Sequence, residues 1–128
     1  MAYLLDTHTF LWFITNDPQL SNKSKKIIEN PDTNVFVSIA SIWEIAIKYS
    51  LGKLELSGPL EGLKEQMELN GFELLSISFD HTWQLSKLPH HHGDPFDRII
   101  IAQAIAENFT VIGKDKNFPK YENLMLLW

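Results

Sequence analysis

The chain has 128 residues, no cysteine and a formal net charge of −5, with 45% hydrophobic and 21% charged residues. These proportions indicate a single globular domain, residues 1–128, and exclude a disordered chain, a disulfide scaffold and any site built on thiolates. The acidic balance argues against a broad basic surface for nucleic acid, although bound cations can still hold phosphates. We find no signal peptide and no membrane span, so we expect a cytoplasmic protein without membrane contact.

Strand and helix patterns alternate along the chain and are separated by turn-forming residues. Asp17-Pro18 and Asn30-Pro31, for example, end the first two helices. The expected helices cover Thr7–Ile14, Asn22–Glu29, a segment capped by Ser38 or Ser41 and running to about Leu51, Pro59–Asn70, Phe79–Ser86 and a last helix from Pro95. The expected strands cover Tyr3–Leu5, Asn34–Val37, Phe72–Ile77, Thr110–Ile112 and Asn123–Leu127. This alternation predicts an α/β fold with a mostly parallel, four- to five-stranded sheet flanked by helices on both faces.

The last helix begins with two acids. Asp94 fits the N-cap, Pro95 fits the first helical position, and Asp97 falls in the first turn. The residues that follow are apolar on almost every side, so we expect the helix to be buried. A carboxylate on a buried face is costly unless something pairs with it. Asp97 is therefore either a partner of the helix cap or a ligand of a metal ion.

Four acidic residues lie in places where surface acids are not expected. Asp6 directly follows the first strand, and Asp115 lies just past the fourth. Glu44 and Asp97 lie near the starts of helices that follow strands or their loops. In a parallel sheet the carboxyl ends of the strands share one rim, where ligands bind. We therefore expect these four side chains to converge.

Each of the four acids also has a simple structural alternative. Asp6 can cap the first helix, and Glu44 can complete a capping box with Ser41. Asp115 can be a turn residue, and Asp97 can support the cap before it. Together, however, these assignments leave several like charges crowded at one rim. A divalent cation removes the conflict, and an oxygen-only ligand set favours Mg²⁺ or Mn²⁺ and hence phosphodiester cleavage.

Four segments, spread over the whole chain, carry a specific combined signature. They are YLLDTHTFLWF at Tyr3–Phe13, SIASIWEIAIKYSLGKL at Ser38–Leu54, LPHHHGDPFDRIIIAQA at Leu88–Ala104 and VIGKDKNFPKY at Val111–Tyr121. In this order they resemble PIN-domain nucleases, and among them the VapC-type toxins of bacterial toxin–antitoxin pairs. The resemblance implies a metal-dependent endoribonuclease that acts on RNA, forms a homodimer and is held inactive by a cognate antitoxin. It also implies a catalytic, metal-binding quartet of Asp6, Glu44, Asp97 and Asp115, with Mg²⁺ or Mn²⁺ as cofactor.

Four further residues are candidates for the same site. Asp94 belongs to the DPFDR form of the motif and can add to the site, while Thr7 either supplies a hydroxyl or is simply the first helical residue. Arg98 either pairs with a carboxylate, which we favour, or reaches an RNA phosphate. His92 either contacts substrate, orients Asp94, or is an ordinary loop residue.

Two alternative functions remain open at this point. The resemblance places Thr or Ser where this chain has Gly113, so a catalytically inactive PIN-like binding module is one alternative. Another metal-dependent phosphotransfer enzyme, with Asp6 as covalent nucleophile, is the second. Such hydrolases place a second acid two residues later, where this chain has His8, which counts against that alternative.

Overall fold

Five short strands form one fully parallel sheet in the computed structural model, which describes all of residues 1–128. Neighbouring strands follow the order β3-β2-β1-β4-β5, and all four pairings are parallel. The strands are β1 Ala2–Leu5, β2 Asn34–Ser38, β3 Glu73–Leu75, β4 Thr110–Ile112 and β5 Met125–Leu127. The expected α/β architecture is confirmed, and the sheet has five strands where four to five were predicted.

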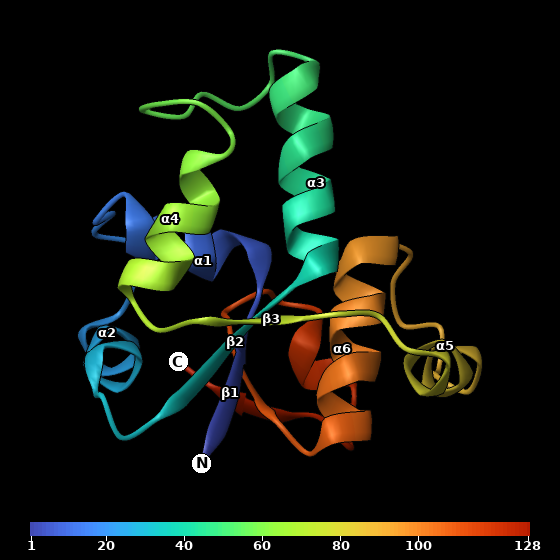
Figure 1. Cartoon of the computed structure of the whole chain (residues 1–128). Coiled ribbons are helices and arrows are strands. Elements are labelled where there is room, and N and C mark those ends of the chain that lie inside the picture. The colour runs from blue at the N-terminus through green and yellow to red at the C-terminus, as the bar shows by residue number, and fades with distance from the viewer.

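Helices cover both faces of this sheet, as predicted (Figure 1). They are α1 Thr7–Ile14, α2 Asn22–Glu29, α3 Ile39–Ser50, α4 Gly62–Leu69, α5 Phe79–Ser86 and α6 Pro95–Glu107, with a short 3₁₀ helix, η1, at Phe118–Lys120. The prediction was wrong at the start of α4, because residues 59–61 form turns and Glu61 supplies no side-chain cap. It also made β3 too long and missed η1.

Each face of the sheet has its own apolar core, because side chains of a strand alternate between faces. Leu5 packs with Phe10 of α1, Ile28 of α2 and Met67 of α4 on one face. The adjacent Leu4 packs with Ile100 of α6 on the other. α6 is the most buried helix of the chain, which agrees with its nearly unbroken apolar sequence. No helix is both long and apolar enough to cross a membrane.

The carboxyl ends of the strands form a rim from which α3 projects (Figure 1). Ser38 ends β2 and caps α3 by accepting a hydrogen bond from the Ala40 N–H at 3.0 Å. The capping box of Ser41 with Glu44 was therefore wrong, since α3 begins before both residues. In the sheet, β2 and β3 lie on one side of β1, whereas β4 and β5 lie on the other. The direction of strand order therefore reverses between β1 and β4, and α/β proteins bind ligands in the crevice at such a point.

Candidate active site

Asp6 lies at this crevice, directly after β1, with only 4% of its surface exposed. Its Oδ1 accepts a hydrogen bond from the Thr9 N–H at 2.8 Å, so Asp6 is also the N-cap of α1. Burial is the main cause that raises the pKa of this carboxyl above its ordinary value, and the charge of Asp115 raises it further. The cap assignment of Asp6 is confirmed, and capping occupies only one of its two oxygens, which leaves the other free for a ligand.

Gly113 leaves room for the Asp6 carboxylate on the neighbouring strand end. A Cβ at this position would lie 3.0 Å from Oδ2 of Asp6 and 2.8 Å from a ring carbon of Phe118. Both separations are shorter than the usual contact between non-bonded heavy atoms. Gly113 lacks the hydroxyl expected from the resemblance, and its missing side chain lets the end of β4 lie close to Asp6.

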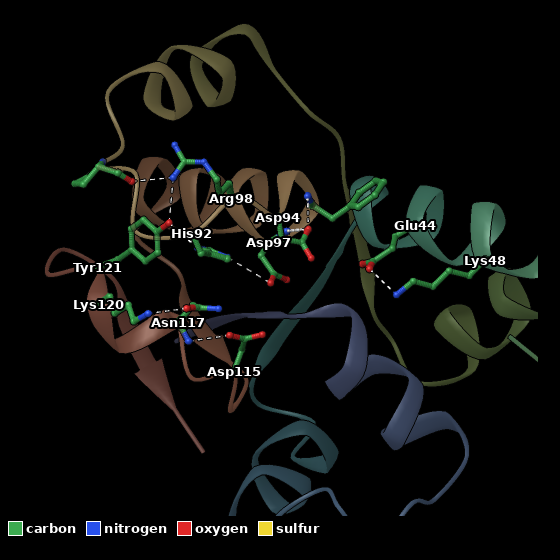
Figure 2. Close-up of polar contacts among 12 residues, drawn as sticks. Glu44, Lys48, His92, Asp94, Asp97, Arg98, Asp115, Asn117, Lys120 and Tyr121 are labelled. Carbon is green, nitrogen blue, oxygen red and sulfur yellow. Dashed lines mark hydrogen bonds and ion pairs between the residues drawn. The ribbon is translucent and has the colours of Figure 1, made fainter. Parts of the chain in front are cut away.

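Asp97 faces the same region from the first turn of α6, with 17% of its side chain exposed. Burial, followed by the charges of Asp94, Asp115, Asp6 and Glu44, raises its pKa to about 7. Every other acid that the sequence singled out therefore contributes to the raised pKa of Asp97. In Figure 2 the Asp97 and Asp115 side chains come from α6 and from the loop after β4, with Glu44 beyond them on α3.

Glu44 and Asp115 each use one carboxylate oxygen in a local contact. Oε2 of Glu44 is 2.9 Å from Nζ of Lys48, whereas its Oε1 is buried without any hydrogen-bond partner. Oδ1 of Asp115 accepts a hydrogen bond from the Asn117 N–H at 2.8 Å, as a turn residue would. Both residues keep a second oxygen free for another ligand.

The donor set has the chemistry of a Mg²⁺ or Mn²⁺ site. All its candidate ligands are carboxylate oxygens, a buried one lacks a partner, and their mutual repulsion raises a pKa. A cleft of about 210 Å³ opens beside them, lined by Asp6, His8, Trp12, Lys114 and Asp115. No three acidic or histidine side chains lie close enough to form a ready-made ligand set. The residues fit a divalent cation in kind and charge, and the side chains must move together to bind it.

Two of the additional candidates have structural roles. Asp94 caps α6, accepting hydrogen bonds from the N–H groups of Phe96 at 2.9 Å and Asp97 at 3.2 Å, as predicted. Thr7 is the first residue of α1, and its buried hydroxyl donates to Oγ of Ser41 at 2.9 Å. This bond joins α1 to α3.

Arg98 differs from its favoured role, and His92 is a loop residue with a neighbour that the sequence did not predict. Arg98 forms no ion pair; its Nη1 donates instead to the carbonyl of Pro89 at 2.8 Å and to the hydroxyl of Tyr121 at 3.0 Å. The favoured carboxylate pair was therefore wrong, because backbone carbonyls of the loop before α6 take the guanidinium. His92 lies beside Asp97, with Nε2 3.5 Å from its Oδ2. Sequence reasoning missed Tyr121, since a lone tyrosine in a loop gives no signal of its partners.

Comparison with known proteins gives a consistent result over nearly the whole chain. The family model of the PIN domain matches residues 3–124. The chain is 27% identical to Ribonuclease VapC22 of Mycobacterium tuberculosis over 124 residues, or 94% of this chain and 92% of that protein. It is 36% identical to Ribonuclease VapC16 of the same organism over 62 residues, which span 48% of this chain and only 44% of that protein.

Solved structures share the fold at lower identity. DNA-bound VapBC from Salmonella typhimurium matches with a TM-score of 0.75 and 16% identity, covering 99% of this chain and 97% of that one. VapBC2 from Rickettsia felis, bound to a DNA fragment of its promoter, matches with a TM-score of 0.71 and 21% identity, covering 99% and 98%.

Proposed function

Because this chain belongs to the PIN-domain family, we propose that it is a metal-dependent endoribonuclease and the toxin of a toxin–antitoxin pair. One observation carries the proposal: carboxylates from four separate segments share one electrostatic neighbourhood at the carboxyl rim of the sheet, where burial and then their charges raise the pKa of Asp97 to about 7. The two relatives from Mycobacterium tuberculosis are ribonucleases by name, which supports RNA as the substrate.

Asp6, Glu44 and Asp97 would hold Mg²⁺ or Mn²⁺, and Asp115 would hold a second ion or a water. A bound divalent cation lowers the pKa of water and stabilises the charge that develops on a phosphate. The chain itself supplies orientation: capping fixes Oδ1 of Asp6, and Lys48 fixes Oε2 of Glu44, which leaves one oxygen of each for the site. Lys114 lines the adjacent cleft, where its positive charge would face the RNA backbone.

The test is RNA cleavage by purified protein with Mg²⁺ or Mn²⁺, compared with an EDTA-treated sample. We expect Asp6→Asn and Asp97→Asn to abolish cleavage. Asp32→Asn, at an exposed acid outside the site, is the matched control and should cleave normally. Equal cleavage by wild type and both site variants would contradict the assignment and point to a contaminating nuclease. Absence of both cleavage and divalent binding would support the inactive binding module.

A protein antitoxin is the partner that we propose for this chain. The Salmonella and Rickettsia structures are VapBC assemblies, and another solved structure that shares the fold is a toxin–antitoxin complex from Klebsiella pneumoniae. A net charge of −5 suits a basic partner segment. The test is co-expression with the product of a small open reading frame directly upstream. That product should co-purify and silence the nuclease, and failure to do either would contradict the proposal.

Self-association is proposed on the exposed side of α3. Ile39, Trp43 and Ile47 recur at helical spacing and are 37%, 59% and 36% exposed, so they form an apolar stripe on the helix that projects from the sheet. We expect a dimer by sedimentation velocity and conversion to monomer by Ile47→Lys. A wild-type chain that stays monomeric at all concentrations would contradict this proposal.

A further inference from the structure

A chain of polar contacts ends at Asp97. Nδ1 of His92 is 2.7 Å from the hydroxyl of Tyr121, and Nη1 of Arg98 is 3.0 Å from the same hydroxyl. On the other side of the ring, Nε2 of His92 is 3.5 Å from Oδ2 of Asp97 and has no hydrogen-bond partner, although it is buried. Figure 2 shows these four side chains in sequence, from Arg98 through Tyr121 and His92 to Asp97.

The direction of hydrogen bonding along this chain follows from Arg98. A guanidinium can only donate, so the Tyr121 oxygen accepts from Arg98. The phenolic hydrogen is then free to point at Nδ1 of His92, which accepts it. In a neutral ring the remaining hydrogen is on Nε2, directed at the Asp97 carboxylate. The opposite tautomer would place the Nε2 lone pair against a carboxylate oxygen, which is repulsive.

The Arg98 end of this series of polar contacts is buried and held by several hydrogen bonds. Arg98 is 7% exposed, and besides Tyr121 it donates to the carbonyls of Pro89 at 2.8 Å and Leu88 at 3.5 Å. Tyr121, next to η1, is only 3% exposed. Arg98 therefore holds the Tyr121 hydroxyl, and this hydroxyl holds Nδ1 of the His92 ring.

We propose that Arg98, Tyr121 and His92 are positioning residues that orient Asp97 by directing Nε2–H of His92 at Oδ2, a contact of 3.5 Å that shortens to a hydrogen bond when the acids draw together around an ion. The proposal rests on the nuclease function proposed above, and it assigns Oδ1 of Asp97 to the acidic cluster. Partners that orient metal ligands in this way commonly change ion affinity by about 10- to 100-fold.

The first test is the tautomer of His92 in metal-free protein at a pH above the Asp97 pKa of about 7, where this carboxylate is ionised. Long-range ¹H–¹⁵N spectra of ¹⁵N-labelled protein distinguish the protonated from the bare ring nitrogen, and His92→Gln identifies the signals of this ring among five histidines. We expect the hydrogen on Nε2, and we expect Tyr121→Phe to weaken that preference. A hydrogen on Nδ1 in the wild type would overturn the proposal.

The second test is Mn²⁺ affinity by calorimetry, without RNA. His92→Leu should weaken binding about 10-fold or more. His92→Gln keeps an amide donor near Asp97 and should restore most of the affinity. Tyr121→Phe should also weaken binding, whereas Tyr3→Phe and His90→Leu, which lie outside the chain of contacts, are matched controls for each change. Unaltered affinity in folded His92→Leu would overturn the proposal, even if Tyr121→Phe failed to fold.

These readouts separate the inference from the function on which it rests. If the wild type cleaves no RNA but shows the expected tautomer and the expected loss of Mn²⁺ affinity, the nuclease function fails and the positioning role stands. If the wild type cleaves RNA and His92→Leu binds Mn²⁺ equally well, the positioning role fails and the nuclease function stands.

Discussion

Replacing Asp97 by Asn should stabilise the metal-free protein at neutral and alkaline pH. Burial and neighbouring acids raise the pKa of Asp97 from its ordinary 3.8 to about 7. Between these values the folded protein keeps a proton that the unfolded chain releases, so rising pH favours unfolding across this window. Asn carries no charge at any pH and removes this loss. The gain is absent near the ordinary pKa, grows as pH rises, and levels off above about pH 7.

The size of this effect follows from the width of the window. Each pH unit contributes about 1.4 kcal/mol, so the full shift corresponds to at most about 4 kcal/mol. Part of the Asp97 side chain faces solvent, which weakens its interactions with the other acids. We therefore expect the free energy of unfolding of Asp97→Asn to exceed that of wild type by about 2–4 kcal/mol at about pH 8. At about pH 4 the two free energies should be nearly equal.

Urea unfolding in EDTA, followed by the fluorescence of the four tryptophans, measures this difference. Asp32→Asn, at an exposed acid, should show no pH-dependent difference from wild type. In a parallel experiment without EDTA, free Mn²⁺ at about 100 times its dissociation constant should stabilise wild type by about 2.7 kcal/mol and leave Asp97→Asn unchanged. A difference that stays flat between acidic and alkaline pH, or an Asn variant that is less stable at about pH 8, would refute the electrostatic reasoning.

Three further substitutions test the surroundings of the site. Gly113→Ala adds a Cβ 3.0 Å from Oδ2 of Asp6; it should cost about 1–3 kcal/mol of stability and weaken Mn²⁺ binding, and calorimetry that shows wild-type affinity would contradict this. Asp94→Ala removes two capping hydrogen bonds from α6 and should lower the free energy of unfolding by about 1 kcal/mol, measured in urea at neutral pH. Thr7→Val removes the buried hydroxyl that donates to Ser41; a loss of about 1–2 kcal/mol is expected, and unchanged stability would show that the bond contributes little.

The sequence was most informative where a local signal ends an element. α1, α2, α5 and β4 have the predicted bounds, and the breaking residues after them suffice to explain this. The cap of α3 could not be assigned from the sequence, because Ser38 and Ser41 both suit an N-cap. Strand pairing decides between them: Ser38 is still paired with Leu75 of β3, and the helix starts at the next residue.

The sequence selected the acids of the candidate site but did not predict their contacts. Strand-end position and apolar surroundings were enough to select Asp6 and Asp97, since parallel strands share a rim. The partner of Arg98 was missed because it depends on unpaired carbonyls in a loop and on Tyr121, which is 23 residues away along the chain. Contacts of this kind follow from tertiary packing and leave no periodic pattern in the sequence.

The fully parallel sheet has a consequence for the genetics of such an enzyme. Every pairing joins segments that are distant along the chain, so the four acids reach the same rim only when these strands have paired. Selection for survivors of a harmful nuclease would therefore recover two kinds of inactive allele. One kind replaces a carboxylate; the other, more numerous, replaces fully buried apolar residues such as Leu5, Val37 or Ile101. The positions of the inactivating substitutions would therefore identify the residues of the apolar core as well as the acids of the site.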